Sequence, residues 1–105
     1  MDKVFFTYLV PIDESLGLLD KIELKEKEKR KIHDVIHSMY EHKIVEVILS
    51  NLDKTHHESF VRMIAQNPYD LEIMSYLKSY NSEIDSLIQD AGKVLHQEII
   101  ALLII

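Results

Sequence analysis

Residues 24–52 have the sequence LKEKEKRKIHDVIHSMYEHKIVEVILSNL, and this stretch decides the fold class. Its first turns alternate Lys and Glu, which are strong helix formers and stabilise one another when they lie on the same helix face. Apolar side chains then recur at helical spacing: Ile32, Val35, Ile36, Met39 and Tyr40. We therefore predict one long helix from about Leu24 to about Leu52.

The second half of this helix is apolar around much of its circumference. The apolar residues there are Ile44, Val45, Val47, Ile48 and Leu49. A helix that is apolar on more than one side must be covered on more than one side. The pattern indicates either the centre of a helical bundle or a helix shared with a second subunit.

The chain after the long helix predicts three more helices. Thr55 and Glu58 have the spacing of a capping box at the start of the first one. Pro68 ends that helix at Asn67, because the residue before a proline is pushed out of the helical region. We expect Asn67 to cap the next helix, with Pro68 at its first position, and Ser82 to open the last one.

The last predicted helix has apolar residues three or four apart between residues 84 and 102. Gly92 lies inside it and costs about 1 kcal/mol relative to Ala, so we expect a close helix crossing at this position. The chain ends on a nearly all-apolar run, Ile99–Ile105. We expect this run to dock on the arm or the long helix, or else to form an adhesive patch.

The N-terminal residues 4–10 are rich in aromatic and β-branched types, which favours an extended arm or a lone strand. A single strand has no partner in a helical chain. We therefore expect residues 1–12 to pack on the helices as an apolar arm, with pairing to a copy in another subunit as the alternative. Asp13–Leu16 has the pattern of a short helical turn, which Gly17 is expected to stop in a left-handed conformation.

The composition fits a single helical domain. A chain of 105 residues is served by one hydrophobic core, and two Gly and two Pro are too few for the turns of an all-β fold. We predict an all-α fold over residues 1–105, a compact helical bundle. It has one long central helix, two short helices and a long C-terminal helix, preceded by the apolar arm.

The charge and the cysteine content narrow the function classes. A net charge of −6 argues against binding to a nucleic-acid backbone, which requires an excess of Lys and Arg. The absence of Cys excludes thiolate zinc sites and cysteine nucleophiles. Residues 4–10 make a poor signal peptide, and no stretch reaches membrane-spanning length. We expect a cytoplasmic protein with neither nucleic-acid nor membrane partners.

One pair of side chains could hold a metal. His33 and His37 lie on one helix face at the spacing of the HExxH zinc proteases. However, Asp34 stands where that motif has its catalytic Glu, and no downstream residue has a known third-ligand spacing. We interpret this flank as a solvated or subunit-facing helix edge, assign no metal, and keep His33 and His37 as the only candidates for a metal site. His96 is isolated, Ser15 has no partners that spacing could assemble, and we assign no catalytic residue and no cofactor.

Two tyrosines four residues apart, Tyr76 and Tyr80, form a second notable pair. Tyr combines a large contact area with a polar tip, so such a pair can form an aromatic contact patch. The alternative is that the two rings close the edge of the core, and this is the interpretation we favour.

Several positions together resemble a known family. Leu16-Gly17-Leu18 precedes the charged run, the long helix ends at Leu52-Asp53, and Phe60, Tyr76-Leu77, Asn81, Ile84, Leu87 and Ile88 follow. Over about residues 12–103 this pattern resembles a family of short, acidic helical proteins of unknown function, common in small-genome candidate-phylum bacteria. The chain departs from that pattern in Gly92 and in the Lys and His residues that dilute its acidic surface. The resemblance implies a helical fold and no catalytic residue.

Three functional hypotheses follow. The first is a non-enzymatic protein–protein interaction module that self-associates as a homodimer. Its expected contact residues are Ile44, Val45, Ile48, Leu49, Tyr76, Tyr80, Ile100, Leu103 and Ile104. The second is a small acidic inhibitor or nucleic-acid mimic that blocks a basic groove of a partner protein. The third is a metal-dependent helical protein that uses His33 and His37.

Overall fold

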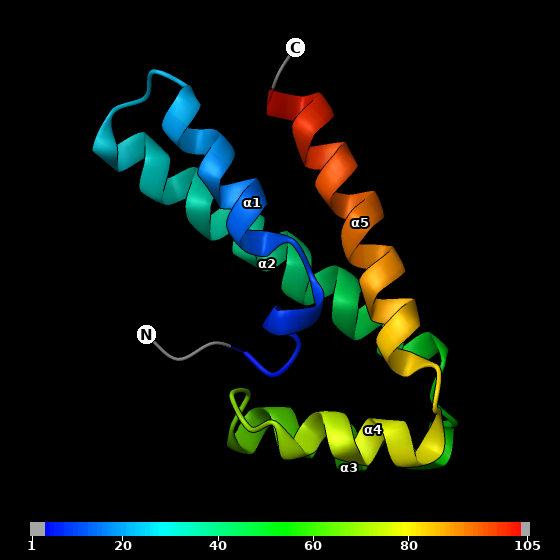
Figure 1. The fold of residues 1–105 in the computed structure, drawn as a ribbon. Coiled ribbons are helices and arrows are strands. Elements are labelled where there is room, and N and C mark those ends of the chain that lie inside the picture. The colour runs from blue at the N-terminus through cyan, green and yellow to red at the C-terminus, as the bar shows by residue number, and fades with distance from the viewer. Residues whose placement is uncertain (1–3, 104–105) are drawn as a thin grey trace.

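The computed structural model describes residues 4–103, and these residues form helices joined by short turns (Figure 1). In chain order the elements are the 3₁₀-helix η1 (Thr7–Leu9), α1 (Ile12–Gly17), the 3₁₀-helix η2 (Leu18–Lys21), α2 (Glu26–Ser50), the 3₁₀-helix η3 (Lys54–His56), α3 (His57–Gln66), α4 (Glu72–Tyr80) and α5 (Ile84–Leu103). No strand occurs in this part of the chain. The predicted all-α fold is confirmed, with one long helix, two short ones and a long C-terminal one.

Helices α2 and α5 form the spine of the molecule. They run in opposite directions beside each other, and α1 packs against both of them. The pair α3 and α4 lies across the end of the spine where α2 ends and α5 begins (Figure 1). The molecule measures 46 × 25 × 19 Å, so its shortest dimension is about two helix diameters.

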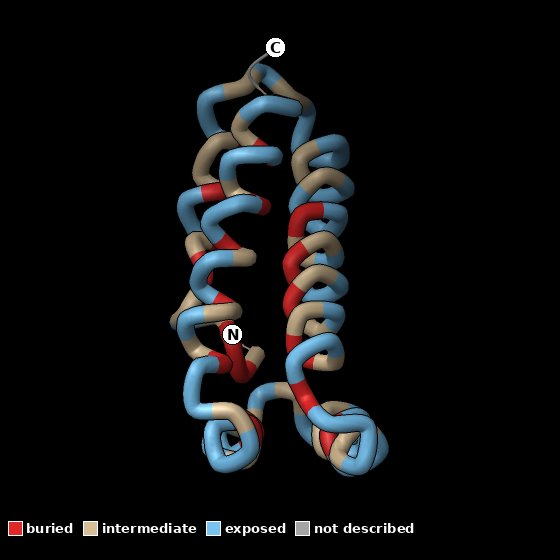
Figure 2. Tube along the Cα trace, turned by 90° about the vertical axis from the view of Figure 1, so that its right-hand side faces the viewer, coloured by how far each residue is buried: buried red, intermediate tan, exposed pale blue. Residues whose placement is uncertain are grey.

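The core lies where the helices face each other. In α2 the buried residues recur every fourth position, at Ile36, Tyr40, Ile44 and Ile48, because such residues share one helix face. In α5 the buried positions are Ile84, Ile88, Gly92, Leu95 and Ile99. Figure 2 shows these buried positions on the inner sides of the helices and exposed positions on their outer sides. The expectation that Ile44 and Ile48 serve as contact surface is therefore wrong, since the chain's own helices bury both.

The N-terminal arm packs on the helices, as expected, but it contains no strand in its described part. Phe5 and Phe6 are buried, and the Phe5 ring lies edge-on to Phe60 at 6.2 Å between centroids. The Phe5 N–H donates to the Pro68 carbonyl at 2.9 Å. Local bonds of the 3₁₀ type, such as Leu9 N–H to Phe6 O, satisfy backbone groups that a lone strand would leave without partners.

The start of α3 differs from the predicted capping box. Asp53 provides the cap instead of Thr55, and its Oδ1 accepts from both the backbone N–H and the hydroxyl of Thr55, each at 2.9 Å. A 3₁₀ turn follows, and α3 begins at His57 without a side-chain cap. A carboxylate is the stronger acceptor, so Thr55 acts here as a donor.

The helix predicted to begin at Pro68 begins four residues later, at Glu72. Asn67 Oδ1 accepts from the Tyr69 N–H at 3.1 Å, and Asp70 Oδ1 accepts from the Glu72 N–H at 2.9 Å. Each side chain bonds to a backbone group two residues further on, which holds a turn rather than a helix. The predicted end of α3 before Asn67 is confirmed.

The start of α5 is also held by a side chain that bonds to the backbone two residues further on. Asn81 Oδ1 accepts from the Glu83 N–H at 3.0 Å, and α5 begins at Ile84. The cap is therefore Asn81 and not Ser82, the residue predicted from the sequence. The Asn81 side chain also donates to the Asn51 carbonyl at 3.0 Å. One amide therefore ties the end of α2 to the start of α5.

The two glycines have different surroundings. A Cβ on Gly92 would lie 2.6 Å from Cγ1 of Val10 and 3.3 Å from Cδ of Pro11. We had expected a crossing helix at Gly92. The close approach is made by the arm instead. Gly17 is right-handed, with a φ of −61°, because α1 continues directly into η2 instead of stopping.

Candidate functional site

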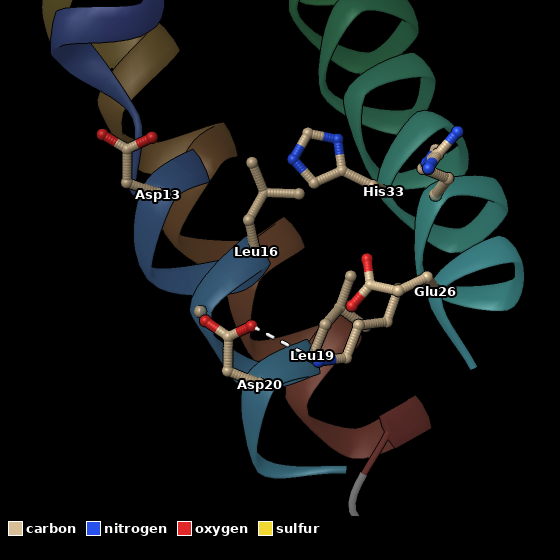
Figure 3. A pocket seen from close by; sticks show the side chains of 9 residues that line it. Asp13, Leu16, Leu19, Asp20, Glu26 and His33 are labelled. Carbon is tan, nitrogen blue, oxygen red and sulfur yellow. Dashed lines mark ion pairs between the residues drawn. The ribbon is translucent and has the colours of Figure 1, made fainter. Parts of the chain in front are cut away.

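The groove between α1 and α2 contains the predicted histidine pair. Figure 3 shows His33 extending from α2 toward Leu16 of α1 above a hollow of about 490 Å³. Charged residues surround this hollow, and Lys29 Nζ lies 3.8 Å from Asp20 Oδ1 across it. The lining residues are Asp13, Leu16, Gly17, Leu19, Asp20, Glu26, Lys29, Arg30 and His33.

A second hollow, of about 470 Å³, also includes His33 and extends along α2 to His37 and Glu41. The rings of His33 and His37 lie 4.9 Å apart at an angle of 45°. The structure thus brings the two imidazoles together, as their spacing predicts. Between residues 4 and 103, however, no group of three or more His, Asp or Glu side chains converges to hold a metal ion.

A buried polar cluster lies at the junction of α1, α2 and α5. Ser15 is fully buried, and its Oγ lies 2.7 Å from the Tyr40 hydroxyl and 2.6 Å from His96 Nδ1. Burial raises the pKa of Tyr40 above its ordinary value, and the hydrogen bond with Ser15 opposes this shift. The Tyr40 hydroxyl also donates to the Pro11 carbonyl at 3.4 Å.

This cluster was missed in the sequence because its members are far apart in the chain. A serine beside a histidine is the arrangement of an activated nucleophile. Ser15, however, has no exposed surface at which a substrate could reach it. One feature of the sequence could have indicated that Ser15 is buried. It lies between Ile12 and Leu19 at helical spacing, and these two residues are on the buried face of α1 and η2. A polar residue at such a position needs a partner in the core.

The predicted tyrosine pair forms an aromatic cluster with a histidine. Tyr76 and Tyr80 lie 5.1 Å apart edge to face, and His56 stacks on Tyr80 at 3.7 Å. Tyr76 is half-buried and packs against the core, whereas Tyr80 is exposed. The cluster therefore closes the edge of the core and also presents one ring to the surface. His56 was not predicted to belong to this cluster.

One side of α2 remains uncovered. Val35 is 56% exposed, although its position has the helical spacing of core residues. It is two residues from both His33 and His37, and two residues correspond to about 200° around a helix. Because those histidines line the groove with α1, Val35 points away from α1. Val35 lines an open hollow on the α2 surface with Asp34, Ser38, Met39 and His42.

Helix α5 continues this uncovered side. Val94 is 55% exposed and is two residues from both Gly92, which contacts the arm, and His96, which bonds to α1. It therefore also points away from the arm and α1. We call this side of the spine the outer face and define it by Val35 and Val94, with the half-buried Met39 and Ala91 beside them.

The outer face was not identified from the sequence. Of the predicted contact residues, Val45, Leu49, Ile100 and Leu103 are half-buried, and Ile104 lies outside the described residues. Val35 was assigned to the core stripe of the long helix. A periodic pattern marks a face as apolar but does not tell whether the fold covers it.

Comparison of the chain with protein families, with curated proteins and with solved structures finds no match. The resemblance to the acidic helical family therefore stays a prediction. Over residues 4–103, no helix combines the length and the apolar character needed to cross a membrane.

Proposed function

We propose that this protein is a non-enzymatic interaction module that self-associates through the outer face. The observation that carries the proposal is the exposure of Val35 and Val94 by more than half on the side of the spine that points away from α1. Apolar side chains that gather on one face of a small protein are typical of a contact surface.

The shape of the molecule supports this function. The spine and α1 make it about two helices thick, at 19 Å in its shortest dimension. Helix α1 covers one side of the spine, whereas no described element covers the outer face. A symmetric dimer buries the same patch of both copies, so each apolar residue contributes twice. Burying the exposed half of a valine stabilises the dimer by roughly 1 kcal/mol.

The polar clusters of the fold favour a binding role over an enzymatic one. Ser15 is enclosed in the core, and His33 and His37 converge with no third ligand in the described part of the chain. The hollow that contains both histidines has three carboxylates, Asp13, Asp34 and Glu41, beside apolar residues such as Ile12 and Leu16.

Glutamate substitutions on the outer face test the proposal. We expect Val35→Glu and Val94→Glu to abolish or strongly weaken the dimer, measured by size-exclusion chromatography with light scattering, because each places a charge in an apolar contact. Val61→Glu is the matched control, since Val61 is 52% exposed but lies in α3, away from this face. Equal dimerisation of all three variants would refute the outer face as the contact surface.

A further inference from the structure

Resting on the proposed self-association, we infer that the second copy docks with its α2 antiparallel to the first, and that Lys31 of each copy faces Glu46 of the other. The order of charged and uncharged residues along one exposed strip of α2 sets this orientation and selects this pair of charges.

The strip runs along α2 at helical spacing. Lys31, Val35, Ser38, His42 and Glu46 follow one another at intervals of three or four residues and are all exposed. Such intervals keep side chains on one helix face. Val35, Ser38 and His42 line the same open hollow together with Asp34 and Met39. The strip therefore has Lys31 at one end and Glu46 at the other, and Asp34 adds one acidic side chain beside its centre.

The charges of the strip are complementary to those of a second copy that runs in the opposite direction. Lys31 and Glu46 are equally far from the point between Ser38 and Met39. When two copies of α2 run in opposite directions about that point, each Lys31 lies opposite Glu46 of the other copy. Two symmetric ion pairs then flank the centre of the contact.

A parallel arrangement has the opposite effect. It places Lys31 opposite Lys31 and Glu46 opposite Glu46, so like charges face each other at both ends of the strip. Like charges across a contact are unfavourable, and such charges set the orientation of paired helices. Within each copy His42 Nε2 lies 3.8 Å from Glu46 Oε2.

The net charge of the chain makes this complementarity necessary. Each copy carries a formal charge of −6, so two copies repel each other at long range. The strip itself contains one Lys and one Glu, and Asp34 lies beside it, so the contact region is less acidic than the chain as a whole. Opposite charges at both ends of the strip supply attraction that works against the long-range repulsion.

A charge exchange tests the arrangement. We expect Lys31→Glu and Glu46→Lys, each alone, to weaken the dimer Kd about tenfold, because each puts like charges opposite one another at two symmetric positions. The double variant Lys31→Glu/Glu46→Lys restores opposite charges and should return the Kd to within about threefold of the original. Arg30→Glu is the control, since Arg30 is also exposed on α2 but lines the hollow beside α1.

The outcomes separate the two proposals. Kd is measured by sedimentation equilibrium, and circular dichroism confirms equal helix content in every variant. Restoration in the double variant, with the control unchanged, supports antiparallel docking. A double variant no better than either single variant overturns that docking but leaves a dimer through the outer face. An unaltered chain that is monomeric throughout overturns both.

Discussion

Ser15 in α1 and His96 in α5, which are 81 positions apart in the chain, share a hydrogen bond of 2.6 Å. The same serine lies 2.7 Å from the Tyr40 hydroxyl of α2, so one hydroxyl joins three helices. Buried polar groups without partners are costly, and this cluster therefore fixes where α1 sits on the spine. The position of α1 in turn decides which face of the spine remains uncovered.

Ser15→Ala should lower the free energy of unfolding by about 1–3 kcal/mol. The substitution removes the hydrogen-bond partner of the buried Tyr40 hydroxyl and of the partly buried His96 Nδ1. Urea denaturation followed by circular dichroism measures this change. Ser59→Ala is the control, since Ser59 is exposed in α3 and its loss should change the stability by no more than about 0.5 kcal/mol. Equal effects of the two substitutions would show that the cluster has no role in stability.

The two glycines should respond in opposite ways to alanine. Gly92→Ala places a methyl group 2.6 Å from Val10 Cγ1, and the arm has to shift. We expect a loss of about 1–3 kcal/mol in the free energy of unfolding. Gly17→Ala should add about 0.4–1 kcal/mol, because no atom lies within 4 Å of the new methyl group and the backbone is already helical. Thermal unfolding of both variants tests this, and destabilisation by Gly17→Ala would contradict it.

The cap at Asp53 should make stability depend on pH in the acidic range. The backbone N–H of Thr55, followed by its hydroxyl, holds the pKa of Asp53 below its ordinary value of 3.8. The folded-state pKa is lowered, so the stabilisation is present above pH 3.8 and is lost as the pH falls through the folded-state pKa.

Asp53→Ala tests this dependence. We expect the variant to be less stable than the original chain near neutral pH, and the difference to shrink as the pH falls below 3.8. Thermal unfolding at a series of pH values measures both effects. A difference that stays constant down to the lowest pH would show that the ionised carboxylate does not provide the cap.

The sequence allowed the helices to be predicted because their signals are local. The apolar period and the Lys/Glu run placed the long helix within two residues of its observed bounds, Glu26–Ser50. Helix starts were less predictable. Near each helix start, several polar side chains could accept a hydrogen bond from the same backbone N–H group. Which of them does so depends on the backbone conformation of the turn. In this structure the acceptors are Asp53, Asn67 and Asp70.

Contacts between segments that are far apart in the chain could not be predicted from the sequence. The contact of Ser15 with His96 and that of Gly92 with Val10 depend on how α1 lies on the spine, and no local pattern encodes that position. The outer face has the same origin. Val35 and Val94 occupy helical positions that would fit a core, and only the packing of the chain leaves them exposed.

Sedimentation equilibrium of the unaltered chain over a concentration series tests the central claim of self-association most directly. We predict a mass of twice the chain mass of 12.3 kDa at micromolar concentration. Dilution should shift this mass toward that of one chain, as reversible association requires. A mass of one chain at all concentrations into the high micromolar range would contradict the proposed function.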